Sequence, residues 1–426
     1  MHLVDPGARS ESVTGSGARG PLEGRGPSSS ASASSSRERI STIVIDDADA
    51  LAIAVAHRIA RVIQGRQAEG LGTVLGLATG STPLGVYREL VRLHREAGLS
   101  FRNVTTFNLD EYVPMEPGNR HSYHRFMWEH LFSHVDIDPA HVHIPRGDLP
   151  RGEIAAACLA YEDAIREAGG IDLQILGIGK TGHIGFNEPG SGADSRTRLV
   201  TLDGITRRDA ASDFFGEGNV PREAVTMGVA TILAAREIAI IATGEHKAPI
   251  VRRAVEGEVD HQVAATFLQG HANTTFWLDR PAAAELTRIA TPWLVDEVQW
   301  TDDLAERAVV WLSLSIDRAI LKLTARDYAE HHLSSLLAGY GSAGDLNGLV
   351  FNRLGARIRG RSKLPRDRRI LCFSPHPDDD VISMGGILRK LVLNGNRITV
   401  AYMTSGNVAV FDHDVRRHVD WLRRMA

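Results

Sequence analysis

Residues 75–84 read Leu75-Gly-Leu-Ala-Thr-Gly-Ser-Thr-Pro-Leu84 and indicate a strand, a tight turn and the start of a helix. The apolar run Thr73–Ala78 predicts a buried strand, and Pro83–Arg95 has the apolar spacing of an amphipathic helix. Thr82 suits the N-cap position, and Pro83 suits the first helical position, where its missing N–H costs nothing. A strand that passes directly into a helix predicts an α/β sheet.

The same alternation continues on both sides of this stretch. Apolar residues at helical spacing predict a helix over Asp46–Gln64, and residues 290–342 also have helical character. Strands alternating with helices favour an α/β fold with an open, mostly parallel, doubly wound sheet. Ligands of such sheets bind at the carboxyl ends of the strands, where the polar motifs of this sequence fall. The other predicted strands are Val104–Asn108, Ile171–Leu176, Glu237–Thr243 and Thr274–Leu278.

Length and composition bound the class of protein. A chain of 426 residues suggests two to three domains, and 43% hydrophobic with 23% charged residues excludes disorder throughout. A net charge of −4 gives no reason to expect nucleic acid or a membrane surface as a partner, and no apolar run is long enough to predict a membrane span. Cys158 and Cys372 cannot form a disulfide framework, so we expect a cytoplasmic protein.

The chain divides by composition into five segments. Arg353–Arg369 carries eight basic residues and one acid, which favours a solvated linker over an anion-binding segment. A new strand is predicted at Ile370–Phe373. The expected segments are a disordered Gly-, Pro- and Ser-rich leader (1–40), an α/β domain (41–290), a helical extension (291–345), a basic linker (346–368) and the start of a second α/β domain (369–426).

Two motifs near the predicted strand ends suggest an anion site and a proton-transfer site. Gly80, Ser81 and Thr82 present backbone N–H groups at a helix start and are phosphate-binding candidates, although a capped helix without a ligand explains them equally well. Asp110 and Glu111 follow a strand in Phe107-Asn-Leu-Asp-Glu-Tyr112. One of them, partly buried, suits a general base with a raised pKa; the alternative is a pair of solvated loop acids.

A glycine-rich loop follows a third predicted strand, in Gly177-Ile-Gly-Lys-Thr-Gly-His-Ile-Gly-Phe-Asn-Glu-Pro189. Its GxGxxG pattern does not predict a dinucleotide site, because Asn-Glu-Pro arrives where a helix would have to continue. The loop instead presents His183 and Glu188 five residues apart, as an acid–base pair. Lys247, in Gly244-Glu-His-Lys-Ala-Pro249, supplies a point charge near the phosphate candidates, or is a surface lysine.

These motifs together resemble glucosamine-6-phosphate deaminase, in order and spacing, over residues 41–290. The resemblance implies an enzyme that converts D-glucosamine 6-phosphate and water to D-fructose 6-phosphate and ammonia in amino-sugar catabolism, without a metal or another cofactor. We therefore expect an amino-sugar phosphate as the substrate and a homo-oligomer. The matching stretches are Thr79–Pro83, Asn108–Tyr112, Ser122–His124, Gly182–Pro189, Ser195–Arg198 and His246–Ala248.

The resemblance also implies roles for the candidate residues. The aspartate that matches Asp110 moves a proton between C2 and C1 of the open-chain sugar. The histidine that matches His183 assists opening of the sugar ring and is supported by the glutamate that matches Glu188. The residues that match Gly80, Ser81, Thr82 and Lys247 hold the phosphate.

Three positions depart from the family pattern. Thr181 stands where the family usually has an acid that helps ring opening, and Val200 stands where regulated members have a lysine. Asp213 stands where phosphate-binding members have an arginine, and Arg207 or Arg208 is the candidate substitute. Two alternatives stay open: an activity like that of the related 6-phosphogluconolactonases, and a sugar-phosphate sensor without turnover.

A last motif, Phe373-Ser-Pro-His-Pro-Asp-Asp-Asp380, resembles the zinc-dependent N-acetylglucosaminyl deacetylases of the PIG-L or LmbE-like group. In that family His376 and Asp379 would be zinc ligands and Asp378 the general base. The family's third ligand, a histidine, lies far downstream of this motif. We therefore expect residues 369–426 to be a truncated deacetylase domain with an incomplete site, and zinc only if that domain were complete. The combination suggests a pathway in which an acetamido sugar is deacetylated and then deaminated.

Overall fold

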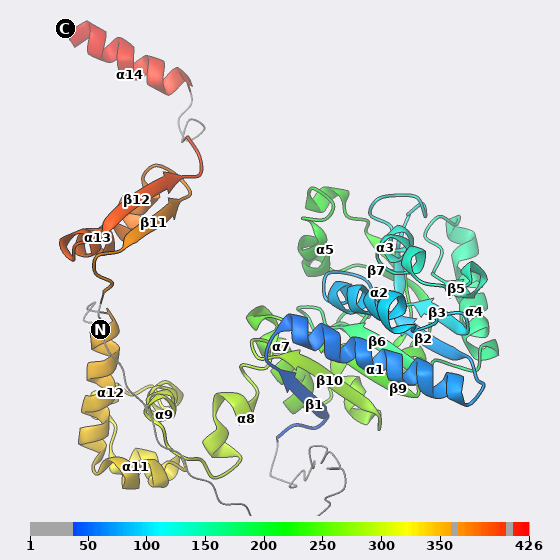
Figure 1. Ribbon diagram of the computed structural model, residues 1–426, viewed down its shortest axis with the longest axis horizontal. Coiled ribbons are helices and arrows are strands. Elements are labelled where there is room, and N and C mark those ends of the chain that lie inside the picture. The colour runs from blue at the N-terminus through cyan, green and yellow to red at the C-terminus, as the bar shows by residue number, and fades with distance from the viewer. Residues whose placement is uncertain (1–36, 359–363, 406–411, 426) are drawn as a thin grey trace, which may run out of the picture. The chain divides into compact units, whose positions relative to one another are not determined.

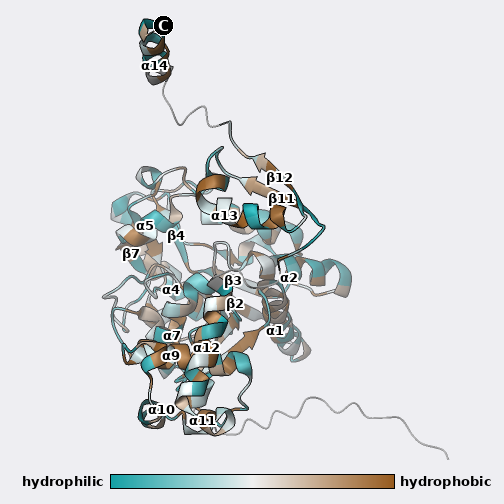
Figure 2. Cartoon of the chain, turned by 90° about the vertical axis from the view of Figure 1, so that its left-hand side faces the viewer, coloured by the Kyte–Doolittle hydropathy of each residue, from teal (hydrophilic) through white to brown (hydrophobic). Residues whose placement is uncertain are grey.

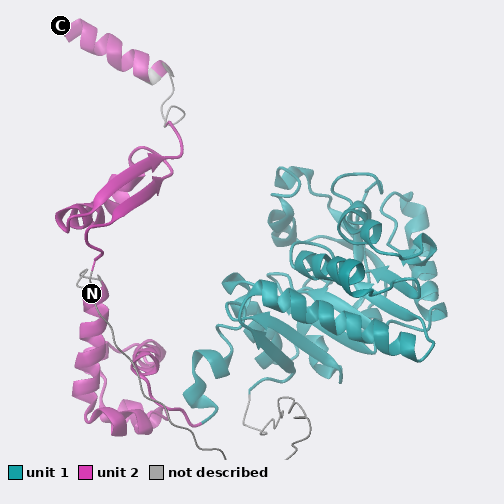
Figure 3. Ribbon diagram, in the orientation of Figure 1, with its two compact units in different colours: residues 1–296 teal, residues 297–426 magenta. Residues whose placement is uncertain are grey.

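The computed structural model of the protein describes residues 37–358, 364–405 and 412–425. It divides the chain into two compact units, residues 1–296 and 297–426 (Figure 3). The predicted leader lies outside the described residues as far as residue 36. The predicted end of the α/β domain, at residue 290, falls a few residues before the boundary between the units.

Unit 1 is built on a seven-stranded sheet with the strand order β1-β10-β9-β6-β2-β3-β5 (Figure 1). All its strand pairings are parallel, so the predicted α/β fold with an open, doubly wound sheet is confirmed. The two edge strands, β1 and β5, were not predicted. The strands are β1 (Ser41–Ile45), β2 (Thr73–Leu77), β3 (Val104–Asn108), β5 (Val142–His143), β6 (Leu173–Gly177), β9 (Glu237–Ala242) and β10 (Thr274–Asp279).

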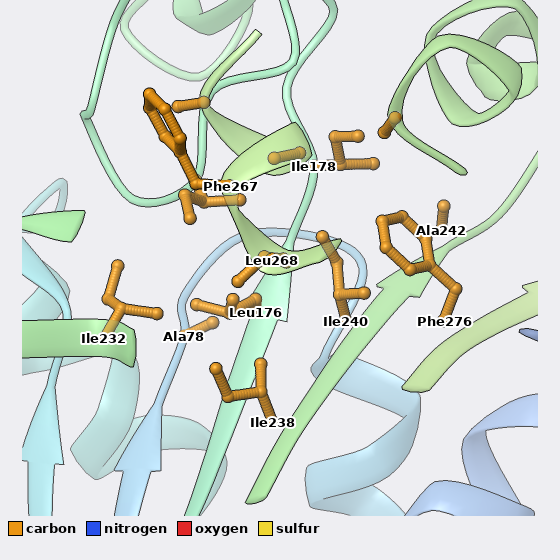
Figure 4. Close-up of a cluster of buried hydrophobic side chains, with 14 of the residues drawn as sticks. Ala78, Leu176, Ile178, Ile232, Ile238, Ile240, Ala242, Phe267, Leu268 and Phe276 are labelled. Carbon is orange, nitrogen blue, oxygen red and sulfur yellow. The ribbon is translucent and has the colours of Figure 1, made fainter. Parts of the chain in front are cut away.

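Helices cover both faces of this sheet because successive side chains of each strand point to opposite faces. In β9, Ile238 and Ile240 join one buried cluster, drawn in Figure 4, and Ala239 and Ile241 join the other. Residues of α4, α6 and α7 pack in the first cluster, and residues of α1, α2 and α3 in the second. The helices of unit 1 are α1 (Ala48–Ala68), α2 (Leu84–Ala97), α3 (Tyr123–His130), α4 (Arg151–Glu167), α5 (Gly204–Ala210), α6 (Val229–Leu233), α7 (Ala248–Glu256) and α8 (Thr287–Ala290).

A second, antiparallel sheet follows the carboxyl end of β3, and the sequence patterns did not predict it. Its strand order is β4-β8-β7, with β4 (Asp110–Val113) paired to β8 (Glu223–Thr226) and β8 paired to β7 (Arg198–Thr201). Asp110 opens β4 and lies opposite Thr226. The pairing of β4 with β8 therefore fixes the backbone at Asp110, the predicted proton-transfer residue.

Unit 2 begins with a group of helices that includes α9 (Asp302–Ser315), α10 (Ala325–Glu330), α11 (Ser334–Tyr340) and α12 (Ala343–Ile358). The basic linker predicted from residue 346 is wrong as far as Ile358, because Leu346 and Val350 are buried on α12 and continue the helical packing. Arg353 and Arg357 of α12 both pair with Glu306 of α9. These two basic residues thus neutralise acids of a neighbouring helix.

Unit 2 also contains a two-stranded parallel sheet of β11 (Arg369–Ser374) and β12 (Arg397–Tyr402), linked by α13 (Asp379–Leu393), and the helix α14 (Asp412–Met425). This agrees with the predicted strand at Ile370–Phe373. Figure 2 colours β11 and β12 largely as hydrophobic, yet Leu371 and Phe373 are 56% and 65% exposed.

Candidate active site

A cavity of about 210 Å³ lies at the carboxyl ends of β2, β3 and β6. This is the position at which parallel α/β sheets bind ligands. The cavity brings together three of the predicted motifs: the turn after β2, the acid after β3 and the glycine-rich loop after β6. The residues that line it are Ala78, Thr79, Gly80, Ser81, Thr82, Leu109, Asp110, Tyr123, Gly177, Ile178, Gly179, His183, Gly185 and Phe186.

Asp110 is the buried carboxyl group of this cavity, with 6% of its surface exposed. Burial, and after it the charge of neighbouring Glu111, raises the pKa of Asp110 to about 8. Among the described residues, no hydrogen-bond donor offsets this cost of ionisation. A carboxyl group with a pKa near the working pH both accepts and donates protons readily, which suits general acid–base catalysis.

Glu111, the other acid of the predicted pair, holds the local structure together. Its carboxylate accepts hydrogen bonds from Ser122 Oγ at 2.9 Å, from Tyr123 N at 3.1 Å and from His124 N at 3.0 Å. These groups belong to the N-terminus of α3, where backbone N–H groups lack partners within the helix. The structure therefore separates the two acids: Asp110 faces the cavity and Glu111 caps a helix.

The variant Glu111→Ala is expected to lower the free energy of unfolding by about 2 kcal/mol, because buried N–H groups at the start of α3 lose their acceptor. Urea unfolding followed by circular dichroism measures the change. Glu116→Ala is the control, since Glu116 is an exposed acid nearby in the chain and should stay within about 0.5 kcal/mol of the wild type. Equal stability of the two variants would contradict the capping role.

His183 is held in the cavity wall through one of its ring nitrogens. Nδ1 lies 2.9 Å from Thr181 Oγ1, 3.4 Å from Glu188 Oε2 and 3.5 Å from Thr206 Oγ1. Three oxygens around Nδ1 favour the tautomer with its proton on that nitrogen, which leaves Nε2 as the basic atom. Nε2 packs against Gly179, where a Cβ atom would come within 2.0 Å of it. The glycine is therefore required by the position of the imidazole ring.

Glu188 is positioned to balance a charge on His183. Burial alone would raise the pKa of Glu188, but its contacts with His183 and further hydrogen bonds hold that pKa below the ordinary value. Its Oε1 also accepts a hydrogen bond from Asp203 N at 3.2 Å, just before α5. The predicted His183–Glu188 pair is thus brought together, with Thr181 making the shorter contact to the imidazole.

The turn after β2, which carries the predicted phosphate-binding residues, lines part of the cavity. Gly80 adopts φ +96°, a conformation that favours glycine, and Ser81 and Thr82 continue the turn along the cavity wall. The predicted N-cap role of Thr82 is wrong, because the turn extends through Pro83 and α2 begins at Leu84 without a side-chain cap. The backbone N–H groups at this helix start are therefore not used by a capping side chain.

Of the two predicted phosphate-binding cations, Lys247 bonds directly to a residue of the cavity wall. Its Nζ donates to the carbonyl oxygen of Ile178 at 2.8 Å, and Ile178 lines the cavity. Arg207 lies on α5, does not line the cavity and donates through Nη2 to the carbonyl oxygen of Glu217 at 3.0 Å. Asp213, the acid at the position of the family arginine, is exposed.

Comparison with known proteins decides the family. The sequence model described as "Glucosamine-6-phosphate isomerases/6-phosphogluconolactonase" matches residues 46–277, just over half of the chain. The chain belongs to this family. Glucosamine-6-phosphate deaminase 2 of Giardia intestinalis is 47% identical to it over 250 residues, which cover 58% of this chain and 92% of the relative.

Two further proteins are similar to the chain. A putative glucosamine-6-phosphate deaminase-like protein of Bacteroides thetaiotaomicron is 42% identical over 396 residues, which cover 89% of this chain. The chain spans 60% of the length of that relative. A solved structure described as a monomeric glucosamine-6-phosphate deaminase, "missing link of the NagB superfamily", is 39% identical, with a TM-score of 0.56, and matches 58% of this chain and 100% of its own.

Outside the region that defines the family, residues 371–424 match the family model described as GlcNAc-PI de-N-acetylase. His376 Nδ1 lies 2.9 Å from Asp379 Oδ2, so the two predicted zinc ligands are neighbours. Within residues 37–358, 364–405 and 412–425, no three or more His, Cys, Asp or Glu side chains gather to hold a metal ion. Two ligands do not make a catalytic zinc site.

None of the helices in the described part of the chain is both long and apolar enough to cross a membrane.

Tyr123 and Thr206 are site residues that the sequence patterns did not single out as candidates. Tyr123 lines the cavity, and its hydroxyl lies 3.2 Å from that of Tyr112. Thr206 contacts His183 from α5, 23 residues further along the chain. Thr206 has no local signal, because α5 lies far along the chain from the glycine-rich loop. Tyr123 begins α3 and did fall inside the matching stretch Ser122–His124.

Proposed function

We propose that the protein converts D-glucosamine 6-phosphate and water to D-fructose 6-phosphate and ammonia. The observation that carries the proposal is the buried Asp110 carboxyl, with a pKa of about 8, in one cavity with His183 and the anion-binding turn. The names of the relatives support it: those from Giardia intestinalis and Bacillus subtilis, at 47% and 49% identity, are glucosamine-6-phosphate deaminases.

Asp110 is assigned the proton transfer between two carbons of the open-chain sugar. Its carboxylate takes the proton from C2 of the 2-amino aldehyde and returns it to C1, while a second proton passes from the amino nitrogen to the C1 oxygen, so that the amino aldose becomes a 2-imino ketose. Water then adds to C2 and ammonia leaves, so the product carries a ketone at C2. A single buried carboxyl group that both accepts and donates a proton near neutral pH fits this sequence of steps.

His183 is assigned the opening of the sugar ring. Its Nε2 takes the proton from the hydroxyl at C1 and delivers it to the ring oxygen, while Nδ1–H stays directed at Thr181 and Glu188. The negative charge of Glu188 stabilises the imidazolium that forms during this transfer. Thr181 takes the place of an acid in the family pattern, so one carboxylate rather than two supports the histidine.

Gly80, Ser81 and Thr82 are assigned to the binding of the phosphate, together with Lys247.

The homo-oligomer stays a prediction, and so does the order of deacetylation before deamination that the C-terminal resemblance suggests. The proposal requires no metal or other cofactor for this reaction.

The test is the appearance of ammonia and fructose 6-phosphate in equal amounts when the purified protein is given glucosamine 6-phosphate. Glucosamine without the phosphate is the matched control and should react far more slowly, because the anion-binding turn then has no ligand. Hydrolysis of 6-phosphogluconolactone without ammonia release would replace the proposal with the lactonase activity. Binding of the amino-sugar phosphate without any product would leave a sensor.

A further inference from the structure

The two lysines of unit 1 lie beside the same wall of the cavity. Lys180 and Lys247 are the only lysines among residues 1–321, a stretch that otherwise uses arginine as its basic residue. Lys180 directly follows Gly179, and Lys247 bonds to the carbonyl oxygen of Ile178. Gly179 and Ile178 both line the cavity, as does Gly80 of the turn after β2. The fold thus gathers two point charges, 67 positions apart in the sequence, at one place.

Lys247 lacks an anionic partner of its own. Its ammonium group is partly buried, its Nζ donates to a neutral carbonyl oxygen, and among the described residues no carboxylate lies within ion-pair distance. Burial lowers the pKa of Lys247, nearby Asp209 raises it and the charge of Lys180 lowers it further. A desolvated ammonium without a counter-ion is unfavourable, so this position favours the binding of an anion.

Lys180 is the neighbouring charge, and its partner is only a surface acid. Its Nζ lies 2.6 Å from Asp209 Oδ1 at the end of α5, and the lysine side chain is 52% exposed. An ion pair this exposed contributes little to stability, so Lys180 gives it up at low cost when a stronger anion arrives. A phosphate dianion is such an anion, since it carries two charges and three acceptor oxygens.

A phosphate dianion favours more than one cation, and Lys247 supplies only one. No lysine or arginine lines the cavity itself, Arg207 is engaged with the Glu217 carbonyl oxygen, and position 213 carries an acid. We propose that Lys180 is a phosphate-binding residue. It breaks its ion pair with Asp209 and contacts the phosphate of the substrate, together with Lys247 and the turn at Gly80. The inference rests on the proposed function only for the sugar part of that substrate.

Titration calorimetry with inorganic phosphate at fixed low ionic strength tests this assignment without depending on turnover. Lys180→Met is expected to weaken phosphate binding at least tenfold, whereas Lys180→Arg, which keeps the charge, should stay within about threefold of the wild type. Arg166→Met removes another exposed, ion-paired charge, from the end of α4 that leads into β6, at the opposite edge of the sheet. That control should bind phosphate like the wild type.

Asp209→Asn distinguishes two roles of Lys180: contact with phosphate, or a purely structural ion pair with Asp209. If Lys180 contacts phosphate, removal of the competing carboxylate leaves the affinity unchanged or raises it. If the Lys180–Asp209 pair only holds α5, then Asp209→Asn and Lys180→Met weaken phosphate binding equally, and the proposal is wrong. Unchanged affinity in Lys180→Met, or no phosphate binding by the wild type, overturns it as well. Lys180-dependent phosphate binding without ammonia release would overturn the deaminase function and keep this assignment.

Discussion

Asp110→Asn is expected to lower kcat for ammonia release by a factor of about 10² to 10⁴ while the protein stays folded. Asparagine keeps the shape of the side chain but cannot accept the proton from C2, and general acid–base groups contribute rate factors of this size. The same substitution should raise the melting temperature, by an amount that grows as the pH rises from the ordinary pKa of 3.8 to the raised pKa of about 8 and is largest above it, because it removes a carboxylate that burial makes costly to ionise. Ammonia release gives kcat and thermal unfolding gives the melting temperature, both measured on the same preparations.

The pH dependence supplies the control for this variant. The proton acceptor is the ionised form of Asp110, whose pKa is raised to about 8, so kcat/KM of the wild type should fall about tenfold per pH unit below that value. The decrease in kcat/KM that is caused by protonation of Asp110 should be absent from Asp110→Asn. A decrease that both proteins show is caused by protonation of the substrate. A variant with near wild-type turnover, or an unchanged pH profile, would remove Asp110 from the mechanism.

The strands around the cavity were predicted well because they are buried on both faces. β2, β3, β9 and β10 read as short apolar runs, and their observed bounds differ from the predicted ones by at most a residue or two. The antiparallel sheet that begins at Asp110 was missed, since its strands are only four residues long and mix charged with apolar residues. A pattern of that length does not distinguish a strand from a loop.

The roles of paired charges were the least predictable feature. Asp110 and Glu111 are adjacent and chemically alike, and only the fold shows that one faces the cavity while the other caps α3. Arg353 and Arg357 were interpreted as part of a solvated linker, although α12 presents both to Glu306 some fifty residues earlier. In each case the deciding partner is set by tertiary packing and leaves no local signal in the sequence.

His183→Gln is expected to lower kcat/KM for glucosamine 6-phosphate about 10²-fold, because glutamine keeps a polar side chain but cannot carry the proton from the C1 hydroxyl to the ring oxygen. The loss should be confined to ring opening. An open-chain amino-alditol 6-phosphate, which has no ring to open, should therefore bind the variant within about threefold of the wild-type affinity. His57→Gln is the matched control, since His57 lies on α1 and its side chain contacts Glu89 outside the cavity.

The two measurements together decide what His183 does. Loss of turnover with retained binding of the open-chain compound assigns the histidine to ring opening and leaves Asp110 with the later proton transfer. Loss of both would show that His183 mainly shapes the cavity, which its close packing against Gly179 makes a concrete alternative. Full turnover in His183→Gln would mean that the reaction does not use His183, although one carboxylate and two threonine hydroxyls lie around its Nδ1. The enzyme would then act on the open-chain form of the sugar.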